Sequence, residues 1–262
     1  MARSASSCGG EALSTDTNRP LAGKCVLITG GARRIGREIA LTLARAGADI
    51  AFTYLKSGND AEQTSATLTK SGVRTFSIRC DLRDVKSIES CAGEAIAKLG
   101  RLDLLINNAG AYETVAFEEI TPEQWDAMFD VNVRAAFFMS QACAKELRAR
   151  NGRIVNIGSL GGIRPWATHA HYCASKAALH MLTQSAAKAM APEVKVNCIA
   201  PGMIDQGESA RGSEVLENFA AKTPVQRNGT AADVAQSVLF LATCPDFITG
   251  QILAVDGGLG LV

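Results

Sequence analysis

The sequence predicts one α/β domain built on a doubly wound parallel sheet of about seven strands. From Lys24 onward, short β-branched runs alternate with longer stretches whose apolar residues recur every three or four positions. Short turns join the two kinds of segment, and such alternation implies right-handed crossovers with helices on both faces of the sheet. No internal repeat or linker divides the 262 residues, so a single domain is expected.

The expected strands are nearly continuous apolar runs, which is typical of strands covered on both faces. They are Cys25–Thr29, Asp49–Tyr54, Arg74–Arg79, Leu102–Ile106, Arg153–Ile157, Lys195–Ile199 and Gln251–Val255. Helices are expected between them, among others at Ile35–Ala46, Ala170–Met190 and Ala232–Ala242. Residues 202–227 break this rhythm with mixed charges and a helical piece near 214–221. We interpret them as a substrate lid, with an ordinary surface insertion as the alternative.

Composition excludes several classes of function. The formal net charge is +1, which gives no general surface for a polyanion and argues against nucleic-acid or membrane-surface roles. No apolar run is long enough to span a bilayer. The eight cysteines form no CxxC pair and are expected to be free thiols in a reducing cytoplasm. Residues 1–22 are expected to be a flexible leader, and residues 23–262 the folded domain.

A glycine-rich loop follows the first expected strand and leads at once into a helix. It reads Thr-Gly-Gly-Ala-Arg-Arg-Ile-Gly at residues 29–36. Glycine permits the tight turn, and the free amides at the helix start can face a pyrophosphate. A lone glycine loop is weak support, but its place in the alternating pattern indicates a dinucleotide-binding Rossmann fold. The residues expected to make this contact are Gly30, Arg33, Arg34, Ile35 and Gly36.

The end of the second strand bears on which dinucleotide is bound. Many such folds place an acid there to hold the ribose 2′-hydroxyl, whereas this chain has Tyr54-Leu55-Lys56-Ser57. A carboxylate would repel a 2′-phosphate, while Lys56 and Ser57 can pair with it and Arg33 can approach from the glycine loop. The alternative is a solvated polar turn. We expect NADP(H) as cofactor, contacted here by Tyr54, Lys56 and Ser57.

A tyrosine and a lysine provide a candidate proton donor. Tyr172 and Lys176 are four residues apart, which puts both on one face of the expected helix. A nearby ammonium favours a phenolate, so Tyr172 could protonate a carbonyl oxygen as a hydride arrives. Ser159 lies just beyond the fifth strand and could hydrogen-bond the same oxygen. A Tyr-xxx-Lys pair alone is a common surface pattern, and it gains weight only beside the glycine loop.

Together these features resemble the short-chain dehydrogenase/reductase family over about Lys24–Val262. The resemblance rests on independent motifs along the chain, namely the loop at 29–36, Asp81-Leu82, Asn107-Asn108-Ala109-Gly110, Asn132 within Val-Asn-Val, Ser159 with Tyr172 and Lys176, Pro201-Gly202, and Asp256-Gly257-Gly258. It implies that Asp81 bonds the adenine amino group with Leu82 beside it. It also implies that Asn132 holds a water between Lys176 and solvent. For the assembly, the resemblance implies a homotetramer with the C-terminal strand in a subunit interface. The further cofactor contacts that it implies are Asn108, Ala109, Gly110, Tyr172, Lys176, Pro201, Gly202 and Ile204.

The substrate is less well defined than the class. Ser159 is similar to 3-oxoacyl-carrier-protein reductases and general ketone reductases. Arg34 and the Tyr54–Ser57 pattern are instead similar to pteridine reductases, which typically carry an aspartate in place of that serine. We expect a 3-oxoacyl thioester or related ketone, with a pterin as the alternative. A non-catalytic NADP(H)-binding sensor is a second alternative, although a sensor would not need the complete Ser/Tyr/Lys/Asn set.

Three other residues near Tyr172 are candidates for metal binding or substrate contact. His169 and His171 lack carboxylate or cysteine partners at ligand spacing, so no metal site is expected. Both are expected to face solvent at the helix start, with contact to the substrate as the alternative. Trp166 is expected to pack in its own loop, with stacking on a flat substrate as the alternative.

Overall fold

A seven-stranded parallel sheet forms the centre of the protein. The computed structural model describes residues 19–207 and 213–262. The strand order is β3-β2-β1-β4-β5-β6-β9, and every neighbouring pair is parallel. The order reverses between β1 and β4, because the chain builds outward from β1 in one direction and then returns to add β4 on the other side. This confirms the expected doubly wound Rossmann sheet of seven strands.

The observed elements match the expected ones closely in position. The strands of the large sheet are β1 Cys25–Ile28, β2 Asp49–Tyr54, β3 Thr75–Arg79, β4 Leu104–Asn107, β5 Arg153–Ile157, β6 Lys195–Pro201 and β9 Ile252–Val255. The helices are α1 Arg34–Arg45, α2 Gly58–Thr69, α3 Val85–Leu99, α4 Pro122–Phe129, α5 Ala135–Ala149, α6 Ala170–Met190, α7 Ser213–Lys222 and α8 Ala231–Thr243. A short pair that sequence patterning does not signal joins β7 Ile204–Asp205 to β8 Gly229–Thr230.

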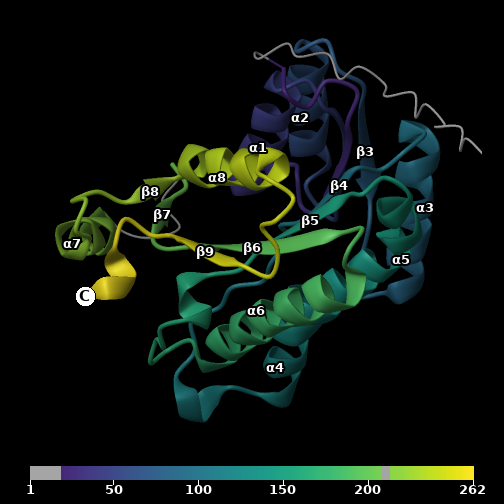
Figure 1. Cartoon of the computed structure of the whole chain (residues 1–262). Coiled ribbons are helices and arrows are strands. Elements are labelled where there is room, and N and C mark those ends of the chain that lie inside the picture. The colour runs from purple at the N-terminus through teal and green to yellow at the C-terminus, as the bar shows by residue number, and fades with distance from the viewer. Residues whose placement is uncertain (1–18, 208–212) are drawn as a thin grey trace, which may run out of the picture.

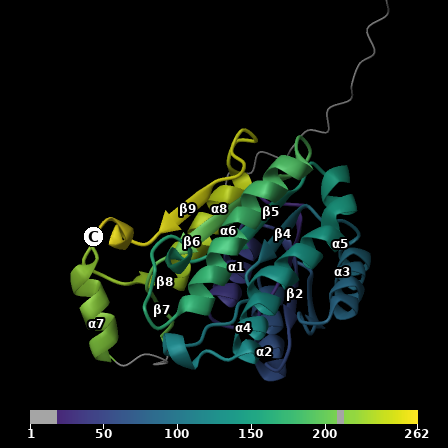
Figure 2. The ribbon, with the colours of Figure 1, turned by 90° about the horizontal axis from the view of Figure 1, so that it is seen from below.

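Helices cover both faces of the sheet and create two apolar cores. On one face α1 packs against α8 and α2, and on the other α3, α5 and α6 lie side by side (Figure 1). The strands alternate their side chains between the cores, so that Val26 and Ile28 face one and Leu27 faces the other. Figure 2 shows α7 and the C-terminus at one end of the molecule and α3 at the other.

The two edge strands correct the expectation that every strand is covered on both faces. β9 pairs only with β6, and Leu253 in it is 38% exposed. β3 forms the opposite edge and is mostly half-buried. A strand at a sheet edge lacks one neighbour, so apolar character there does not guarantee burial.

The packed part of the chain begins before residue 23. Leu21 is buried in the core and its backbone N–H donates to the carbonyl of Ala46 at 2.8 Å. Residues 19–22 therefore belong to the folded unit, whereas the rest of the expected leader lies outside the described residues. In the described ranges, no helix combines the length and the apolar character needed to cross a membrane.

Candidate active site

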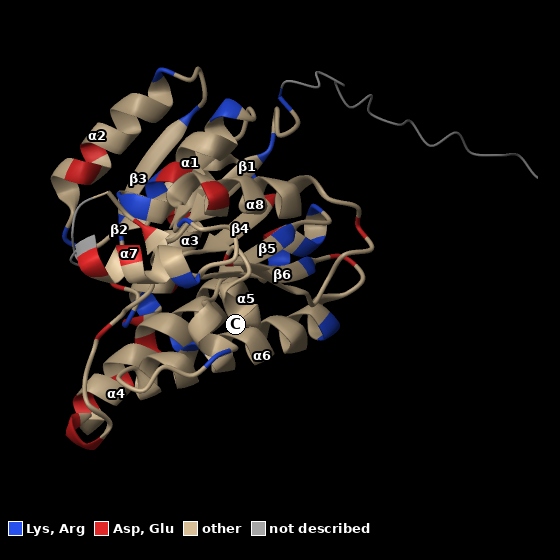
Figure 3. Cartoon of the chain, turned by 90° about the vertical axis from the view of Figure 1, so that its left-hand side faces the viewer, with Lys and Arg blue, Asp and Glu red and all other residues tan. Residues whose placement is uncertain are grey.

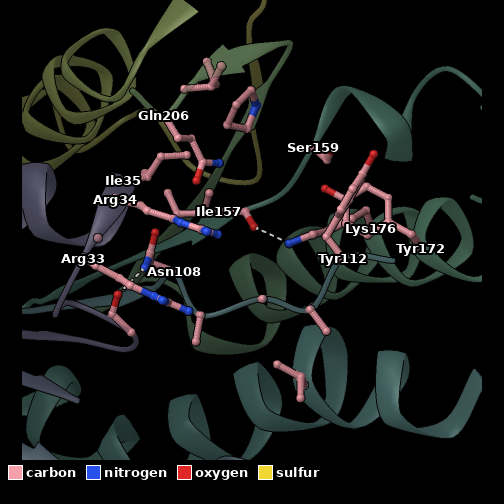
Figure 4. Close-up of a pocket in the computed structure, with 18 of the residues that line it drawn as sticks. Arg33, Arg34, Ile35, Asn108, Tyr112, Ile157, Ser159, Tyr172, Lys176 and Gln206 are labelled. Atoms are coloured by element: carbon pink, nitrogen blue, oxygen red, sulfur yellow. Dashed lines mark hydrogen bonds between the residues drawn. The ribbon is translucent and has the colours of Figure 1, made fainter. Parts of the chain in front are cut away.

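One large cleft opens at the carboxyl ends of the strands and holds the predicted site. Its volume is about 1320 Å³. In open α/β sheets this edge, near the reversal of strand order, is where ligands bind. Every predicted cofactor and catalytic residue except Asn132 contributes to the lining. Figure 4 shows Arg33, Arg34 and Asn108 toward one end of this cleft, and Ser159, Tyr172 and Lys176 toward the other.

The glycine loop is fixed by hydrogen bonds from the neighbouring strand. The side-chain amide of Asn108 donates to the carbonyls of Thr29 and Gly30, at 2.9 and 3.0 Å. In return, the Thr29 hydroxyl accepts from the backbone N–H groups of Asn108 and Ala109, each at 3.0 Å. This mutual bonding leaves the start of α1 open to the cleft. Asn108 therefore fixes the glycine loop to the end of β4 and also forms part of the cleft wall.

Two positions of the loop illustrate its geometric demands. A Cβ added to Gly36 would lie 2.1 Å from the carbonyl oxygen of Gly30 and 2.5 Å from the amide nitrogen of Asn108, so only glycine fits. Arg34 has a φ of +53°, in the left-handed region that glycine adopts at least cost. The arginine thus keeps the backbone geometry of a glycine while it adds a cation to the cleft.

The end of the cleft at the start of α1 is positively charged. Arg33, Arg34 and Lys56 are exposed and form no ion pair within the described part of the chain. Ser57 precedes α2 and lines the same wall as Tyr54. No carboxylate follows β2 directly, as the sequence indicates. Three unpaired cations together with an open helix start suit an anionic ligand with more than one phosphate.

Asp81 and Leu82 lie in the wall that follows β3. The carboxylate of Asp81 accepts from the guanidinium of Arg83 at 2.8 Å and from the Arg83 backbone N–H at 3.0 Å. These bonds lower the pKa of Asp81 to about 2, so it is ionised at neutral pH. An ionised carboxylate of fixed orientation is a suitable acceptor for an exocyclic amino group.

Tyr172, Lys176 and Ser159 meet at the other end of the cleft. The Nζ atom of Lys176 lies 5.9 Å from the ring centre of Tyr172 and donates to the carbonyl of Ile157 at 2.9 Å (Figure 4). Burial lowers the pKa of Lys176 to about 8, which leaves it protonated in most molecules at neutral pH. The Ser159 hydroxyl accepts from the backbone N–H of Gly161 at 3.0 Å, which orients it. The structure therefore brings the predicted trio together.

Asn132 lies behind the cleft instead of in its lining. It occupies a π-helical turn, Asp130–Arg134, between α4 and α5 and is 1% exposed. Its side chain accepts from the N–H of Ala111 at 2.8 Å and donates to the Ala111 carbonyl and to the Ser175 hydroxyl. The side chain thus ties the β4–α4 connection to α6. The expected water-holding role of Asn132 remains a prediction.

An aromatic wall beside Tyr172 is only partly foreseen by the sequence. The ring of Trp166 stacks on that of Tyr172 at 6.0 Å with planes 15° apart, while Tyr112 meets it edge-on at 5.0 Å. The Nε2 atom of His169 is 2.6 Å from the Tyr112 hydroxyl and 2.9 Å from that of Thr114. Trp166 does pack in its loop, but it also lines the cleft. Tyr112 lies four residues beyond Asn108, and no local pattern distinguishes it.

A buried histidine supports the loop that carries Ser159. The ring of His180 accepts from the backbone N–H of Ser159 at 3.4 Å. A Cβ on Gly158 or Gly162 would approach this ring to 2.3 or 2.6 Å, so two glycines leave room for it. Burial, together with the charge of Lys176, lowers the pKa of His180 to about 4. The imidazole is neutral at physiological pH and can act as the acceptor that this geometry requires.

His171 corrects the expectation that both histidines at the start of α6 face solvent. It is 0% exposed, and neither ring nitrogen has a hydrogen-bond partner among the described residues. Its nearest charged group is the Glu113 carboxylate, at 3.7 Å. The helix turns this side chain inward because Tyr172, the next residue, occupies the face toward the cleft. His169 is half-buried and lines the cleft.

Replacing His171 with leucine is expected to stabilise the protein. A buried polar group without a partner costs about 1–3 kcal/mol, and an apolar side chain of similar size removes that cost. We expect His171→Leu to raise the free energy of unfolding by about 1 kcal/mol in urea titrations at pH 7.5. Glu113→Gln serves as the control for the neighbouring carboxylate. If His171→Leu instead lowers the free energy of unfolding by about 1 kcal/mol, the Glu113 carboxylate stabilises the buried imidazole.

The segment after β6 closes the cleft on its last side. Pro201 ends the strand and Gly202 follows it, and Ile204 is 8% exposed in the adjoining core. From the predicted lid, Leu216 and Phe219 of α7 reach the lining. Residues 208–212 of that segment lie outside the described residues. Within the described ranges, no cluster of three His, Cys, Asp or Glu side chains is placed to hold a metal ion.

The fold agrees with comparisons to known proteins. Residues 30–260 match a family model described as enoyl-(acyl carrier protein) reductase. The chain belongs to the short-chain dehydrogenase/reductase family and is an oxidoreductase.

Individual relatives within this family resemble the chain over nearly its whole length. A 3-oxoacyl-[acyl-carrier-protein] reductase from Staphylococcus aureus is 35% identical, covering 90% of this chain and 98% of that one. A sorbitol dehydrogenase from Cereibacter sphaeroides is 37% identical over 91% of this chain and 98% of its own. Among solved structures, a Serratia marcescens short-chain dehydrogenase/reductase has a TM-score of 0.88 at 35% identity, covering 92% and 99% of the two chains. A metagenomic blue fluorescent protein in complex with NADPH has a TM-score of 0.87 at 35% identity and the same coverage.

Proposed function

We propose that this protein reduces a ketone to an alcohol with NADPH, using Tyr172 as the general acid. The observation that carries this proposal is the meeting of Tyr172, Lys176 and Ser159 at one end of a cleft whose other end is cationic. A tyrosine one helical turn from a buried lysine is suited to donate a proton, and the serine hydroxyl can hold the acceptor oxygen. A binding protein without chemistry would not require this arrangement.

The cleft fits a dinucleotide with a 2′-phosphate. The open start of α1 would form a cradle for the pyrophosphate, and the close packing of Gly36 against the Gly30 carbonyl gives the loop its shape. Arg33, Lys56 and Ser57 would take the 2′-phosphate, and Asp81 the adenine amino group. A similar solved structure is itself an NADPH complex. NADPH, when bound, supplies the hydride.

The chain's own residues supply the proton and the alignment. Tyr172 would give its hydroxyl proton to the carbonyl oxygen of the substrate, and Lys176 would stabilise the phenolate that remains. Ser159 would hold the same oxygen in line through a hydrogen bond. Asn132 would hold a water through which Tyr172 recovers a proton by way of Lys176. Burial keeps the pKa of Lys176 near 8, so its ammonium can exchange a proton close to physiological pH.

The proposed substrate is a 3-oxoacyl thioester or a related ketone. Support comes from Ser159, which suits ketone reduction, and from 3-oxoacyl-[acyl-carrier-protein] reductases among the relatives. Arg34 in the glycine loop and the aromatic rings of Tyr112 and Trp166 favour a pterin as the second candidate.

Following NADPH absorbance with purified protein tests this proposal directly. Acetoacetyl thioester and dihydrobiopterin are assayed in parallel at equal concentrations. Oxidation of NADPH with the thioester is the expected result, and oxidation with dihydrobiopterin alone would transfer the assignment to the pterin. Tight binding of NADPH with no turnover of either compound would favour the non-catalytic sensor.

Reversing the charge of Lys56 should change the preferred cofactor. A charge-assisted hydrogen bond to a phosphate is worth about 1.5–3 kcal/mol, and glutamate there would also repel it. We expect Lys56→Glu to lower the NADPH-over-NADH ratio of kcat/KM by about 10–100-fold. Lys70→Glu, at the far end of α2, controls for the change in net charge. An unchanged ratio in Lys56→Glu would refute the assignment of the 2′-phosphate site.

We also propose a homotetramer in the cytoplasm. Leu253 on the edge strand, Phe240 on α8 and Leu261 at the C-terminus are exposed apolar residues, and association would cover them. The seven described cysteines are free thiols, which suits a reducing compartment. Sedimentation equilibrium should give a mass of four chains, and a mass of one chain would contradict the proposal.

A further inference from the structure

The geometry points to a substrate that is a small, uncharged ketone, and not a ketone attached to a carrier group that bears phosphates. This inference rests on the proposed function and concerns the same cleft. It follows from two independent features, namely the mainly aromatic and apolar wall beside Tyr172 and the charge of the segments that border the opening of the cleft.

Apart from Lys176, which the proposed reaction uses, the described wall beside Tyr172 offers no Lys or Arg side chain to an anionic substrate. The side chains lining this end are Tyr112, Thr114, Trp166, His169, Leu216 and Phe219. Both ring nitrogens of His169 lie within 2.9 Å of hydroxyl groups, from Tyr112, Thr114 and Thr168. Hydroxyls can donate or accept, so both ring nitrogens of His169 are hydrogen-bonded within the wall. The walls therefore suit an uncharged molecule with an apolar flank beside its carbonyl.

The segments that border this opening are acidic. In the described parts of 111–121, 158–169, 203–207 and 213–228 there are six carboxylates and three basic side chains, counting Arg and Lys. The carboxylates are Glu113, Glu118, Glu119, Asp205, Glu214 and Glu217. Figure 3 shows the acidic segments on α7 and on the turn that leads into α4.

The three basic residues on these segments offset this charge only in part. Arg227 is ion-paired with Asp233 at 2.8 Å, and Arg164 donates to the carbonyl of Gly260. Lys222 is the third, at the end of α7. The exposed cations of the cleft, Arg33 and Arg34, lie at its opposite end (Figure 4). A substrate tethered to phosphates would thus meet like charges at the opening, which slows association and weakens binding.

Two thioesters with the same reacting group test the inference. Acetoacetyl-N-acetylcysteamine is uncharged, whereas acetoacetyl coenzyme A carries phosphates. At low salt we expect kcat/KM to be about 3–10-fold higher for the uncharged ester, with the difference shrinking as salt screens the charges. An equal or higher value for the coenzyme A ester at low salt would overturn the inference.

Charge reversal at the opening provides a matched comparison. The double variant Glu214→Lys/Glu217→Lys, beside the lining residues Val215 and Leu216, should raise kcat/KM for the coenzyme A ester by about 3–10-fold and leave the uncharged ester within twofold. The control Glu89→Lys lies on α3, at the other end of the molecule from α7 (Figures 1 and 2), and should change neither. Equal effects of the opening and control variants on the coenzyme A ester would contradict the role of the local charge.

A binding measurement separates failure of this inference from failure of the proposed function. In a Trp125→Phe background Trp166 is the sole tryptophan, and Trp125 lies outside the cleft, stacked on Phe129. With NADP⁺ present, the uncharged ester should quench Trp166 fluorescence at lower concentration than the coenzyme A ester. If neither ester is reduced but this order holds, the proposed reaction on thioesters fails and the substrate inference stands. Quenching by the coenzyme A ester at lower concentration would overturn it.

Discussion

Tyr172→Phe is expected to lower kcat by about 10²–10⁴-fold, because general acid catalysis contributes about that much. The substitution removes only the hydroxyl, so the ring keeps its stacking on Trp166 and its edge-on contact with Tyr112. NADPH binding, measured by fluorescence titration, should change by about tenfold at most, since a single uncharged hydrogen bond is worth about 0.5–1.5 kcal/mol. The fall in kcat should therefore appear without a comparable fall in cofactor affinity.

A second tyrosine in the same cleft offers the comparison for Tyr172. Tyr112→Phe removes the hydroxyl that contacts His169 and leaves the ring in place. It should raise KM for the substrate more than it lowers kcat, because Tyr112 is proposed to line the substrate wall only. Substantial residual turnover in Tyr172→Phe, or an equally large loss of kcat in Tyr112→Phe, would refute Tyr172 as the proton donor.

Gly36→Ala is expected to abolish measurable NADPH binding and to destabilise the protein. The added methyl group would lie 2.1 Å from the Gly30 carbonyl oxygen and 2.5 Å from the Asn108 amide. Neither group can move away without breaking the hydrogen bond from the Asn108 side chain to the Gly30 carbonyl, which joins the ends of β1 and β4. Overpacking of this kind costs about 1–3 kcal/mol. The loop would also lose the shape on which its contact with the pyrophosphate depends, so we expect NADPH affinity to fall at least about 100-fold.

At another glycine in the chain, substitution by alanine is expected to raise the free energy of unfolding instead of lowering it. Gly93 lies within α3, and a Cβ there would meet nothing within 4 Å. Because glycine is destabilising in a helix interior, Gly93→Ala should raise the free energy of unfolding by about 0.5–1 kcal/mol and leave NADPH binding unchanged. Normal NADPH affinity in Gly36→Ala, measured beside this control, would mean that the loop is not the cofactor cradle.

The sequence was sufficient where structure depends on local patterns. β2, β5 and α6 were predicted with the bounds that they have, because strand and helix periods are properties of short windows. The glycine loop was predicted from its place after the first strand. The spacing of Tyr172 and Lys176 put them on one helical face, and the structure brings Ser159 to the same end of the cleft. Each of these inferences needed only a neighbouring stretch of chain.

The inward face of α6 shows what the sequence could not supply. His171, Ser175, Lys176, His180 and Thr183 are all buried, although their polarity would place them outward on an amphipathic helix. They are tolerated because most of them meet hydrogen-bond partners from β5, the Ser159 loop and the π-helical turn. Such partners come from distant parts of the chain, so no local pattern announces them.

The sequence by itself thus determined the α/β fold, the position of the glycine loop and the identity of the proposed proton donor with its lysine. Only the tertiary structure decided that Tyr112, Trp166 and His169 form a wall beside Tyr172, and that His180 supports the Ser159 backbone. It also decided the pKa of Lys176, which is lowered by burial. The reason is physical: periodicity acts over a few residues, whereas burial and electrostatic surroundings are set by segments that meet only when the sheet has formed.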